Sequence, residues 1–362
     1  MAADASALRQ LTVALDWTPN TNHTGLYVAK AKGWFEEAGL TVSLKSPSEF
    51  EGSYSGDLST DAAKDFPTPC GKVAAGVADF AMNSPEGCVG WNSPPPGSTR
   101  PKLKAVAAML QAQTSAIVTL KASGIDRPAK LDGKVYASYA ARYEGRIVQK
   151  LLQADGGTGD YEEVPHPFLQ VWDLLKEGKA DATWVFMGWE GVEAKLKGVE
   201  LNTFYLQDFG IPYGYAPVLM ASPALIDEQP AVVQAFLGAA ARGFEFAAAQ
   251  PEEAAALLLA GAQAENGVEL DPALVQASQK ELATAYLDPA TEKWGRMSEA
   301  RWSEYLDWLS EAGLLTTFVQ SRAPEPGVSA SLDELRQGNV GELIPRESLA
   351  ASSLFANMFG DE

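Results

Sequence analysis

Short apolar runs alternate with helical patterns over roughly the first 220 residues. Residues 11–15 (LTVAL) and 40–44 (LTVSL) predict strands, and residues 25–39 between them have helical spacing that ends at a glycine. A strand, a loop, a helix and a strand in this order are typical of an α/β domain with a mostly parallel sheet. Further strands are predicted at residues 79–82, 103–110, 116–120, 134–139, 182–186, 203–206 and 218–221.

The pattern becomes mainly helical in the last third of the chain. Helices are predicted at residues 231–250, 252–261, 272–286 and 298–313, after two shorter ones that end near residues 154 and 177. The tail after residue 322 is polar, with one short helix near residues 331–337. Residues 46–69 are aperiodic and predict a long surface loop. The sequence therefore predicts an α/β fold followed by a helical C-terminal segment.

The loops that follow the predicted strands are rich in Trp, Tyr, Asn, Thr, Ser and Glu. They cover residues 16–24, 83–87, 111–115, 140–145, 187–191 and 208–215. In open parallel sheets, ligands bind outside the carboxyl ends of the strands. Aromatic faces beside hydrogen-bonding groups in these loops suit a small, flat, polar ligand.

Composition narrows the classes of partner. The chain has 362 residues, with 28 Lys+Arg against 47 Asp+Glu, a net charge of −19. Such an acidic chain repels nucleic acids and anionic membranes. Its two cysteines and two histidines exclude a disulfide scaffold and a multi-Cys zinc site and leave little for a His-based metal site or triad, so no metal and no cofactor are predicted. We expect Cys70 and Cys88 to be buried free thiols, with a bridge between them as the alternative.

Targeting patterns are absent from the sequence. No apolar run reaches the roughly 18 residues that a membrane span needs. Residues 1–10 lack the basic and apolar regions of a secretory signal. We therefore expect a cytoplasmic or organellar protein, or a periplasmic one if a signal was removed before this numbering.

Two pairs of adjacent residues combine an indole with a carboxylate at a predicted strand end: Asp16-Trp17 and Trp189-Glu190. In the functional interpretation, Trp17 stacks on a flat ring while the carboxylates pair with amino and ring-nitrogen groups. In the structural interpretation, Trp17 belongs to the core and the acids cap helices or stabilise helix dipoles. Glu86, after Ser84-Pro85, has the same two interpretations.

The other candidate ligand-binding residues are Asn20, Asn22, His23, Tyr27, Ser84, Ser115, Arg142, Tyr143, Glu144, Tyr213 and Tyr215. The asparagines either contact the ligand or cap the helix near residue 25, and His23 is either a ligand group or a satisfied loop histidine. Arg142 opens a helix, where a guanidinium and free backbone N–H groups suit a phosphate, or it is a surface arginine paired with Glu144. The two tyrosines of residues 208–215 either close over the ligand or pack in a hinge.

Several motifs resemble one family. They are LDWTPNTNHTGLYVA at residues 15–29, KGWFEEAGL at 32–40, GVADFA at 76–81, GKADATW at 178–184, WEGVE at 189–193 and GIPYGY at 210–215, with weaker matches at 115–125 and 131–134. Over about residues 11–315 the chain resembles the thiamine-pyrimidine family, which includes fungal hydroxymethylpyrimidine-phosphate synthase and bacterial formylaminopyrimidine-binding proteins of ABC importers. The first motif is the most specific one.

The resemblance implies a two-lobed type 2 periplasmic-binding-protein fold. Lobe one would comprise residues 1–116 and 217–362, lobe two residues 117–216, and the ligand would lie in the cleft between them. The implied ligand is an aminopyrimidine precursor of thiamine, with or without a phosphate. The implied partners are this small molecule and, if the protein is exported, an ABC permease. The resemblance leaves the oligomeric state open.

The chain departs from the fungal synthase of that family. It has no Cys-rich CCCFC run, and residues 79–87, the matching stretch, contain neither the Lys that binds pyridoxal phosphate nor the His that donates atoms to the product. The sequence therefore favours a binding protein without catalytic residues. The alternatives are an enzyme of thiamine-pyrimidine synthesis with other chemistry, or an importer component for another small ligand. A sulfonate is one such ligand, which the acids Asp16, Glu86 and Glu190 disfavour.

Overall fold

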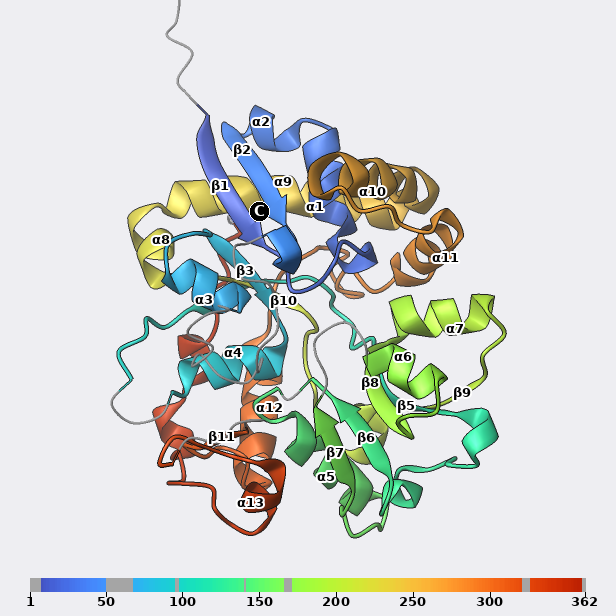
Figure 1. Ribbon diagram of the computed structural model, residues 1–362. Coiled ribbons are helices and arrows are strands. Elements are labelled where there is room, and N and C mark those ends of the chain that lie inside the picture. The colour runs from blue at the N-terminus through green and yellow to red at the C-terminus, as the bar shows by residue number, and fades with distance from the viewer. Residues whose placement is uncertain are drawn as a thin grey trace, which may run out of the picture.

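Two five-stranded sheets form the centres of two lobes in the computed structural model, which describes residues 8–49, 68–94, 98–139, 141–165, 171–320 and 326–359 (Figure 1). The first sheet has the order β2 (Leu40–Lys45), β1 (Arg9–Ala14), β3 (Phe80–Asn83), β10 (Val218–Ala221) and β4 (Lys104–Ala108). The second has the order β7 (Glu162–Pro165), β6 (Val135–Ser138), β8 (Ala182–Phe186), β5 (Ser115–Leu120) and β9 (Leu201–Phe204). The predicted two-lobed α/β fold is confirmed.

Both sheets are parallel except for one inserted strand. In the first sheet β1 pairs in parallel with β2 and β3, and β10 is antiparallel to β3 and β4. In the second, β6 pairs in parallel with β7 and β8, and β5 is antiparallel to β8 and β9. The carboxyl ends of β1, β3, β6 and β8 consequently supply the loops that face the space between the lobes.

Helices cover both sheets. In the first part of the chain they are α1 (Thr24–Ala31), α2 (Trp34–Glu37), α3 (Pro69–Ala74), α4 (Pro85–Asn92), α5 (Glu144–Ala154), α6 (Val171–Lys176) and α7 (Val192–Leu196). The C-terminal part has α8 (Pro223–Glu228), α9 (Pro230–Ala249), α10 (Pro251–Asn266), α11 (Pro272–Leu282), α12 (Glu299–Glu311) and α13 (Leu332–Arg336), with the short strands β11 (Val319–Gln320) and β12 (Ser329–Ala330). The predicted helical C-terminal segment is therefore present.

Three local predictions were wrong. The helix predicted at residues 25–39 is two helices, because Gly33 between α1 and α2 has a φ of +73°, in the left-handed region. Strand β7 was missed because it is a four-residue edge strand that ends in Pro165, which has no N–H to donate. Helix α7, which directly follows the predicted loop at residues 187–191, was also missed. Most of the predicted loop at residues 46–69 lies outside the described residues.

Close helix packing in lobe one fixes the loop that follows β1. Helices α1 and α9 approach so closely that a Cβ on Gly243 would lie 1.9 Å from the carbonyl oxygen of Gly25. On the same helix, Phe236 stacks on Phe80 of β3 at 4.3 Å and on Phe35 at 5.2 Å between ring centroids. A rigid α1 positions residues 16–23 directly before it.

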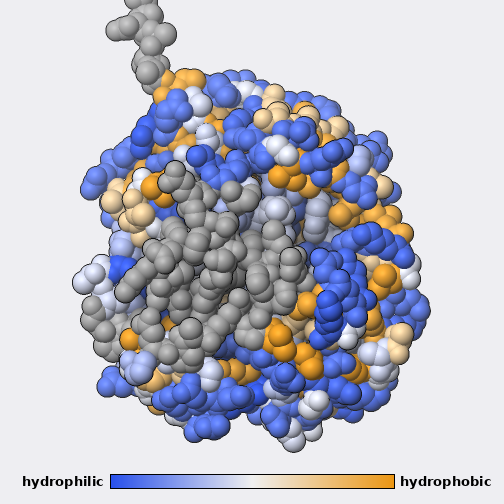
Figure 2. All heavy atoms as spheres, viewed as in Figure 1, coloured by the Kyte–Doolittle hydropathy of each residue, from blue (hydrophilic) through white to orange (hydrophobic). Residues whose placement is uncertain are grey.

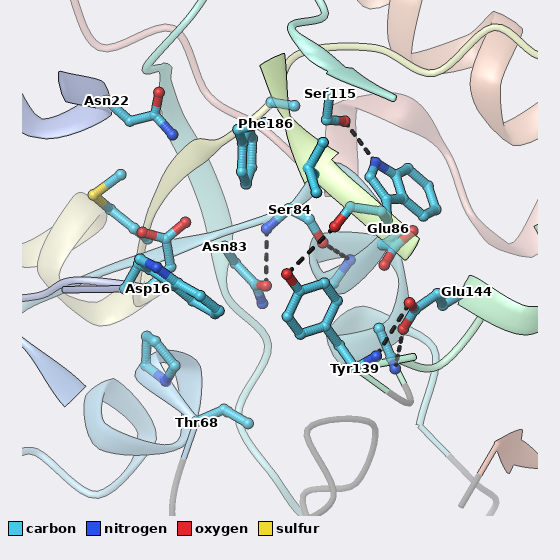
Figure 3. A pocket seen from close by; sticks show the side chains of 18 of the residues that line it. Asp16, Asn22, Thr68, Asn83, Ser84, Glu86, Ser115, Tyr139, Glu144 and Phe186 are labelled. Carbon is cyan, nitrogen blue, oxygen red and sulfur yellow. Dashed lines mark hydrogen bonds between the residues drawn. The ribbon is translucent and has the colours of Figure 1, made fainter. Parts of the chain in front are cut away.

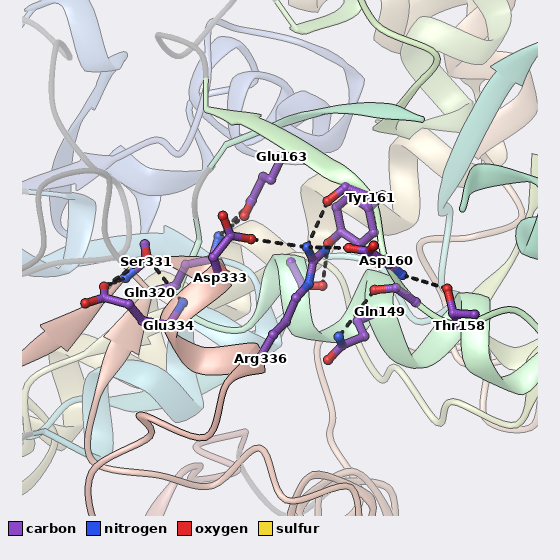
Figure 4. A network of polar contacts seen from close by, with 12 residues as sticks. Gln149, Thr158, Asp160, Tyr161, Glu163, Gln320, Ser331, Asp333, Glu334 and Arg336 are labelled. Atoms are coloured by element: carbon purple, nitrogen blue, oxygen red, sulfur yellow. Dashed lines mark hydrogen bonds and ion pairs between the residues drawn. The ribbon is translucent and has the colours of Figure 1, made fainter. Parts of the chain in front are cut away.

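The chain passes from the first sheet to the second between β4 and β5 and returns between β9 and β10. The exact division at residues 116/117 and 216/217 stays a prediction. After α12 the chain contacts lobe two again: the Gln320 amide donates to Glu163 at 2.6 Å, and Arg336 Nη1 donates to the Tyr161 carbonyl at 2.8 Å (Figure 4). Within residues 313–336, we call the described residues 313–320 and 326–336 the C-terminal strap, because they contact lobe two again after the two crossings between the sheets.

One face of the molecule is mostly polar (Figure 2) and the two cysteines are buried, in agreement with what the composition predicts. The face seen in Figure 2 is largely hydrophilic, with hydrophobic residues scattered between. Cys70 and Cys88 are buried free thiols, as predicted. In the part of the chain that the structure describes, no helix combines the length and apolar character that crossing a bilayer requires.

Candidate ligand-binding site

A cavity of about 210 Å³ lies between the two lobes (Figure 3). A single water needs roughly 10–15 Å³ by this kind of measure, so the cavity has room for a much larger molecule. Of the sixteen predicted site residues, the twelve that line it are Asp16, Trp17, Asn20, Asn22, Ser84, Glu86, Ser115, Arg142, Glu144, Trp189, Glu190 and Tyr213. Loops far apart in sequence therefore meet at one cavity.

Aromatic rings line the cavity from both lobes. Trp17, after β1, meets Tyr139, after β6, edge to face at 5.7 Å between centroids. Trp184 of β8 lies 5.3 Å from Tyr213, and its indole N–H donates to Ser115 Oγ at 2.8 Å. This bond fixes the plane of the Trp184 ring. The arrangement gives a flat ligand several aromatic surfaces whose orientation is already set.

Asp16 is held in place by His23. Backbone N–H of Asn20 donates to His23 Nδ1 at 3.2 Å, so Nδ1 accepts and the proton of the neutral ring is on Nε2, which lies 3.0 Å from Asp16 Oδ1. The side chain of His23 is fully buried, and it does not line the cavity. Its role in the structure is to orient the carboxylate. Asn20 caps the turn, while the Asn22 amide points toward the cavity (Figure 3).

Glu144 is engaged by its own loop. Its carboxyl accepts from Tyr136 Oη at 2.8 Å, from the backbone N–H of Ala141 at 3.0 Å and from that of Tyr139 at 3.1 Å. Burial and the charge of Glu163 raise the pKa of Glu144 to about 7, while these donors oppose the rise. Both oxygens therefore organise the turn between β6 and α5, and the predicted pairing with Arg142 does not occur.

Glu190 lies in a single π-helical turn, Met187–Gly191, at the end of β8. Such turns are rare in proteins, and those that occur often lie at functional sites. Its Oε2 accepts from the backbone N–H of Phe186 at 3.0 Å, and burial raises its pKa to about 7. The turn packs against lobe one, where Ser278 of α11 donates to the Gly188 carbonyl. Trp189 and Glu190 thus reach the cavity from lobe two on a segment anchored to lobe one.

Arg142 is used differently from the prediction. Its Nη1 donates to the carbonyls of Gly90 and Ser93 at 2.7 and 2.6 Å, and its Nη2 donates to that of Thr316 at 2.8 Å. The terminal nitrogens thus tie lobe two to α4 and to the C-terminal strap. These bonds engage both terminal nitrogens of the guanidinium, whereas its Nε is buried without a partner among the described residues. The phosphate-binding interpretation of Arg142 stays a prediction that its two terminal nitrogens, already engaged by carbonyl oxygens, do not favour.

Four predicted site residues lie outside the cavity lining: His23, Tyr27, Tyr143 and Tyr215. Tyr27 is on the side of α1 that packs in the core of lobe one, where its hydroxyl donates to Asn266 at 2.5 Å. Tyr143 is buried against Ser93. Tyr215 accepts from the backbone N–H of Ser298 at 2.7 Å, with the Arg301 guanidinium 3.8 Å from its ring centroid. Tyr143 and Tyr215 thus contact segments of lobe one, and Tyr27 packs within lobe one, but none of the three rings lines the cavity.

Sequence reasoning missed several lining residues, among them Thr68, Asn83, Trp91, Tyr139, Trp184 and Phe186. Asn83 is the last residue of β3 and Tyr139 directly follows β6. The rule that ligands bind at the carboxyl ends of parallel strands could therefore have found both. Trp184 lies within β8, and only the register of the sheet shows that its side chain faces the cavity. Among the described residues there is no group of three or more His, Cys, Asp and Glu that could hold a metal ion.

The two sheets, the crossings between them and the cavity between the lobes define the class of two-lobed ligand-binding proteins. Solved structures share this fold. An alkanesulfonate-binding protein of Xanthomonas axonopodis pv. citri bound to MOPS aligns with a TM-score of 0.59 and 14% identity, over 90% of this chain and 100% of that one. A protein of Bordetella bronchiseptica aligns with a TM-score of 0.62 and 20% identity, over 92% and 98%.

The chain belongs to the NMT1/THI5-like family, whose description matches residues 20–55 and 57–254. The predicted thiamine-pyrimidine resemblance is thereby confirmed. A formylaminopyrimidine-binding protein of Halalkalibacterium halodurans is 28% identical over 316 residues, which are 85% of this chain and 87% of that protein. The C-terminal strap lies beyond the matched family region.

Proposed function

We propose that this protein binds an uncharged aminopyrimidine precursor of thiamine, of the hydroxymethylpyrimidine or formylaminopyrimidine type, between its lobes. The observation that carries the proposal is the lining of the cavity: indoles and phenols surround four carboxyl groups, and Arg142, the one cation among the described lining residues, is bound to carbonyls. Aromatic faces stack on the ring, and acids pair with ring nitrogen and amino groups. The 28% identical formylaminopyrimidine-binding protein supports the same ligand class.

The same lining disfavours anionic ligands. A phosphate or sulfonate needs convergent donors, whereas Asp16, Glu86 and Glu190 present carboxyl oxygens to the cavity. We therefore expect the free pyrimidine to bind at least about tenfold more tightly than its phosphate.

Calorimetric titration tests the proposal, with 4-amino-5-hydroxymethyl-2-methylpyrimidine, its phosphate, formylaminopyrimidine, thiamine and taurine as ligands. At 100 times its Kd a ligand that binds the folded protein stabilises it by about 2.7 kcal/mol, which a thermal-shift assay detects. Stabilisation by taurine alone would overturn the pyrimidine proposal. Stabilisation by pyridoxal phosphate with an imine absorbance would instead favour an enzyme.

Two Trp→Ala variants, which remove side chains of the same size, test where the ligand binds. Trp17→Ala removes a ring that lines the cavity, and we expect affinity to fall by about 10- to 100-fold, since an aromatic stacking contact contributes about 1–3 kcal/mol. Trp34→Ala is the control, because Trp34 lies on α2 against Phe246, away from the cavity lining. Equal losses in both variants would place the ligand elsewhere.

The cellular partner is a separate part of the proposal. Delivery of the pyrimidine to an ABC permease predicts that the protein is found outside the cytoplasmic membrane. A role in biosynthesis or salvage predicts the cytoplasmic fraction. Cell fractionation with an antibody to this chain distinguishes the two.

A further inference from the structure

Glu86 is a buried acid that its own helix does not use. It lies in the first turn of α4, where a carboxylate commonly accepts from free backbone N–H groups. Here Ser84 performs that role, because its Oγ accepts from the backbone N–H of Gly87 at 3.0 Å. Glu86 lines the cavity and is only 5% exposed. Helix capping therefore does not explain why an acid occupies this position.

One carboxyl oxygen of Glu86 has no partner within the described parts of the chain. Its Oε2 is buried and unpaired, whereas Glu144 and Glu190 accept from backbone N–H groups of their own loops. Buried polar atoms in native proteins are nearly always hydrogen-bonded, since an unpaired one costs about 1–3 kcal/mol. The position of this oxygen at the cavity means that a bound molecule is its natural partner.

The groups around Glu86 favour its uncharged form. Glu144 faces it from lobe two with a like charge, and the phenols Tyr213, before β10, and Tyr305, on α12, complete the surroundings. Arg142 packs on Gly90 of α4, the helix that contains Glu86, and its terminal N–H groups donate to backbone carbonyls. Burial, and to a smaller extent the charge of Glu144, raises the pKa of Glu86 to about 8. A side-chain hydrogen bond with Tyr213 acts in the opposite direction. At neutral pH the carboxyl therefore both donates and accepts.

We propose that Glu86 is a specificity-determining residue that recognises, as a neutral acid, a ligand edge with a hydrogen-bond donor next to an acceptor. An amidine-like N–C–NH₂ edge of an aminopyrimidine is such an edge: the ring nitrogen accepts the acid proton, and the amino group donates to the other carboxyl oxygen. The inference deepens the proposed function and rests on it. It assigns to lobe one a contact that selects the amino group, opposite Glu190 of lobe two.

The test compares two variants of Glu86 by calorimetry, with 4-amino-5-hydroxymethyl-2-methylpyrimidine as the probe. Glu86→Gln keeps a donor and an acceptor but cannot ionise, so affinity at pH 7 should stay within about fivefold of the wild type. Glu86→Leu removes both groups, and affinity should fall at least tenfold, the usual effect of leaving polar groups unpaired. Glu228→Gln, an exposed acid at the end of α8, is the control and should bind as the wild type does.

The pH profile separates a neutral acid from a carboxylate. The ionised carboxyl cannot donate, so wild-type affinity relative to Glu86→Gln should weaken as pH rises from 7 through the pKa of about 8 to 9.5. The ratio to Glu86→Gln cancels any titration of the ligand itself. An N,N-dimethylamino analogue of the probe, which lacks the amino donor, should lose at least tenfold on the wild type and much less on Glu86→Leu.

Each contrary result has a distinct meaning. If folded Glu86→Leu, checked by circular dichroism, binds the probe as the wild type does, Glu86 does not contact the ligand. If Glu86→Gln is as weak as Glu86→Leu, the carboxylate acts as a charge, and the neutral-acid proposal is overturned. If the wild type itself does not bind any of the pyrimidines, the proposed function fails, and the inference with it.

Discussion

Two buried charged groups near the cavity, Arg142 and Glu86, differ in how they are satisfied. Arg142 donates to three carbonyl oxygens that come from α4, from the loop after it and from the C-terminal strap. Glu86 keeps a buried carboxyl oxygen without a partner in the described structure, and Arg142 keeps its buried Nε without one, although both of its terminal nitrogens are bonded. A buried charge costs stability unless it is paired or hydrogen-bonded. We infer that the terminal nitrogens of Arg142 serve the fold, and that the carboxyl of Glu86, as proposed, serves a ligand.

The largest expected effect is the loss of Arg142. Arg142→Met leaves three buried carbonyls without their donor, and we expect the free energy of unfolding to fall by about 3 kcal/mol or more. Urea unfolding measures the change. Arg242→Met, which removes a half-exposed arginine paired with Glu37, should cost less than about 1 kcal/mol. A similar loss of unfolding free energy in both arginine variants would contradict the structural role assigned to Arg142.

The next effect separates two acids that look alike in sequence. Glu144→Gln places an NH₂ group opposite donors such as Tyr136 Oη and the Ala141 N–H, and should destabilise the protein by about 2 kcal/mol. Glu86→Gln has no such conflict, since Oε2 has no donor among the described residues. Thermal unfolding at pH 7.5, where the carboxyl of Glu144 is mostly ionised and that of Glu86 is mostly protonated, compares them. A Glu86→Gln protein as unstable as Glu144→Gln would show that Glu86 serves the fold too.

The pH dependence of stability gives an effect of opposite sign, because the Glu86→Gln variant gains stability relative to the wild type. Because the pKa of Glu86 is raised to about 8, the folded state keeps a proton that the unfolded chain has lost above its ordinary pKa of about 4.5. Its contribution to stability is therefore greatest below pH 4.5 and decreases until pH 8. Without ligand, the stability of Glu86→Gln relative to the wild type should therefore increase as the pH rises from 4.5 to 8. A constant difference across this range would contradict the burial of an unpaired acid.

The smallest effect concerns the C-terminal strap alone. Arg336→Ala removes the hydrogen bond to the Tyr161 carbonyl and a cation–π contact with that ring, at 4.3 Å from its centroid. It also removes ion pairs with the exposed carboxylates of Asp333 and Asp160, and Asp333→Asn tests the first of these pairs separately. We expect a loss of about 1 kcal/mol in urea unfolding and unchanged affinity for the pyrimidine. Asp333→Asn, an exposed neighbour, should change stability by less than about 0.5 kcal/mol. A drop in affinity would make the strap part of the binding site.

The architecture could be predicted largely from the sequence. Apolar runs of four to six residues and amphipathic repeats report burial directly, and most predicted strands lie within a few residues of those in the structure. The errors are local. Gly33 splits a predicted helix through its backbone conformation, and β7 has too little apolar pattern to be seen.

The sequence alone also determined which loops meet, because the carboxyl ends of parallel strands share one edge of a sheet. That rule brings Asp16 and Ser84 to one edge of the first sheet and Glu190 to an edge of the second, and the family resemblance implied that the two edges face one cleft. Only the tertiary structure decided what each side chain does there. Glu86, Glu144 and Arg142 all stand near a helix start after a strand, and their roles depend on donors and acceptors supplied by distant segments, such as the Thr316 carbonyl that Arg142 reaches across the lobes. Hydrogen bonds between residues far apart in the chain leave no periodic signal in it, so the free oxygen of Glu86 becomes visible only when the lobes are assembled.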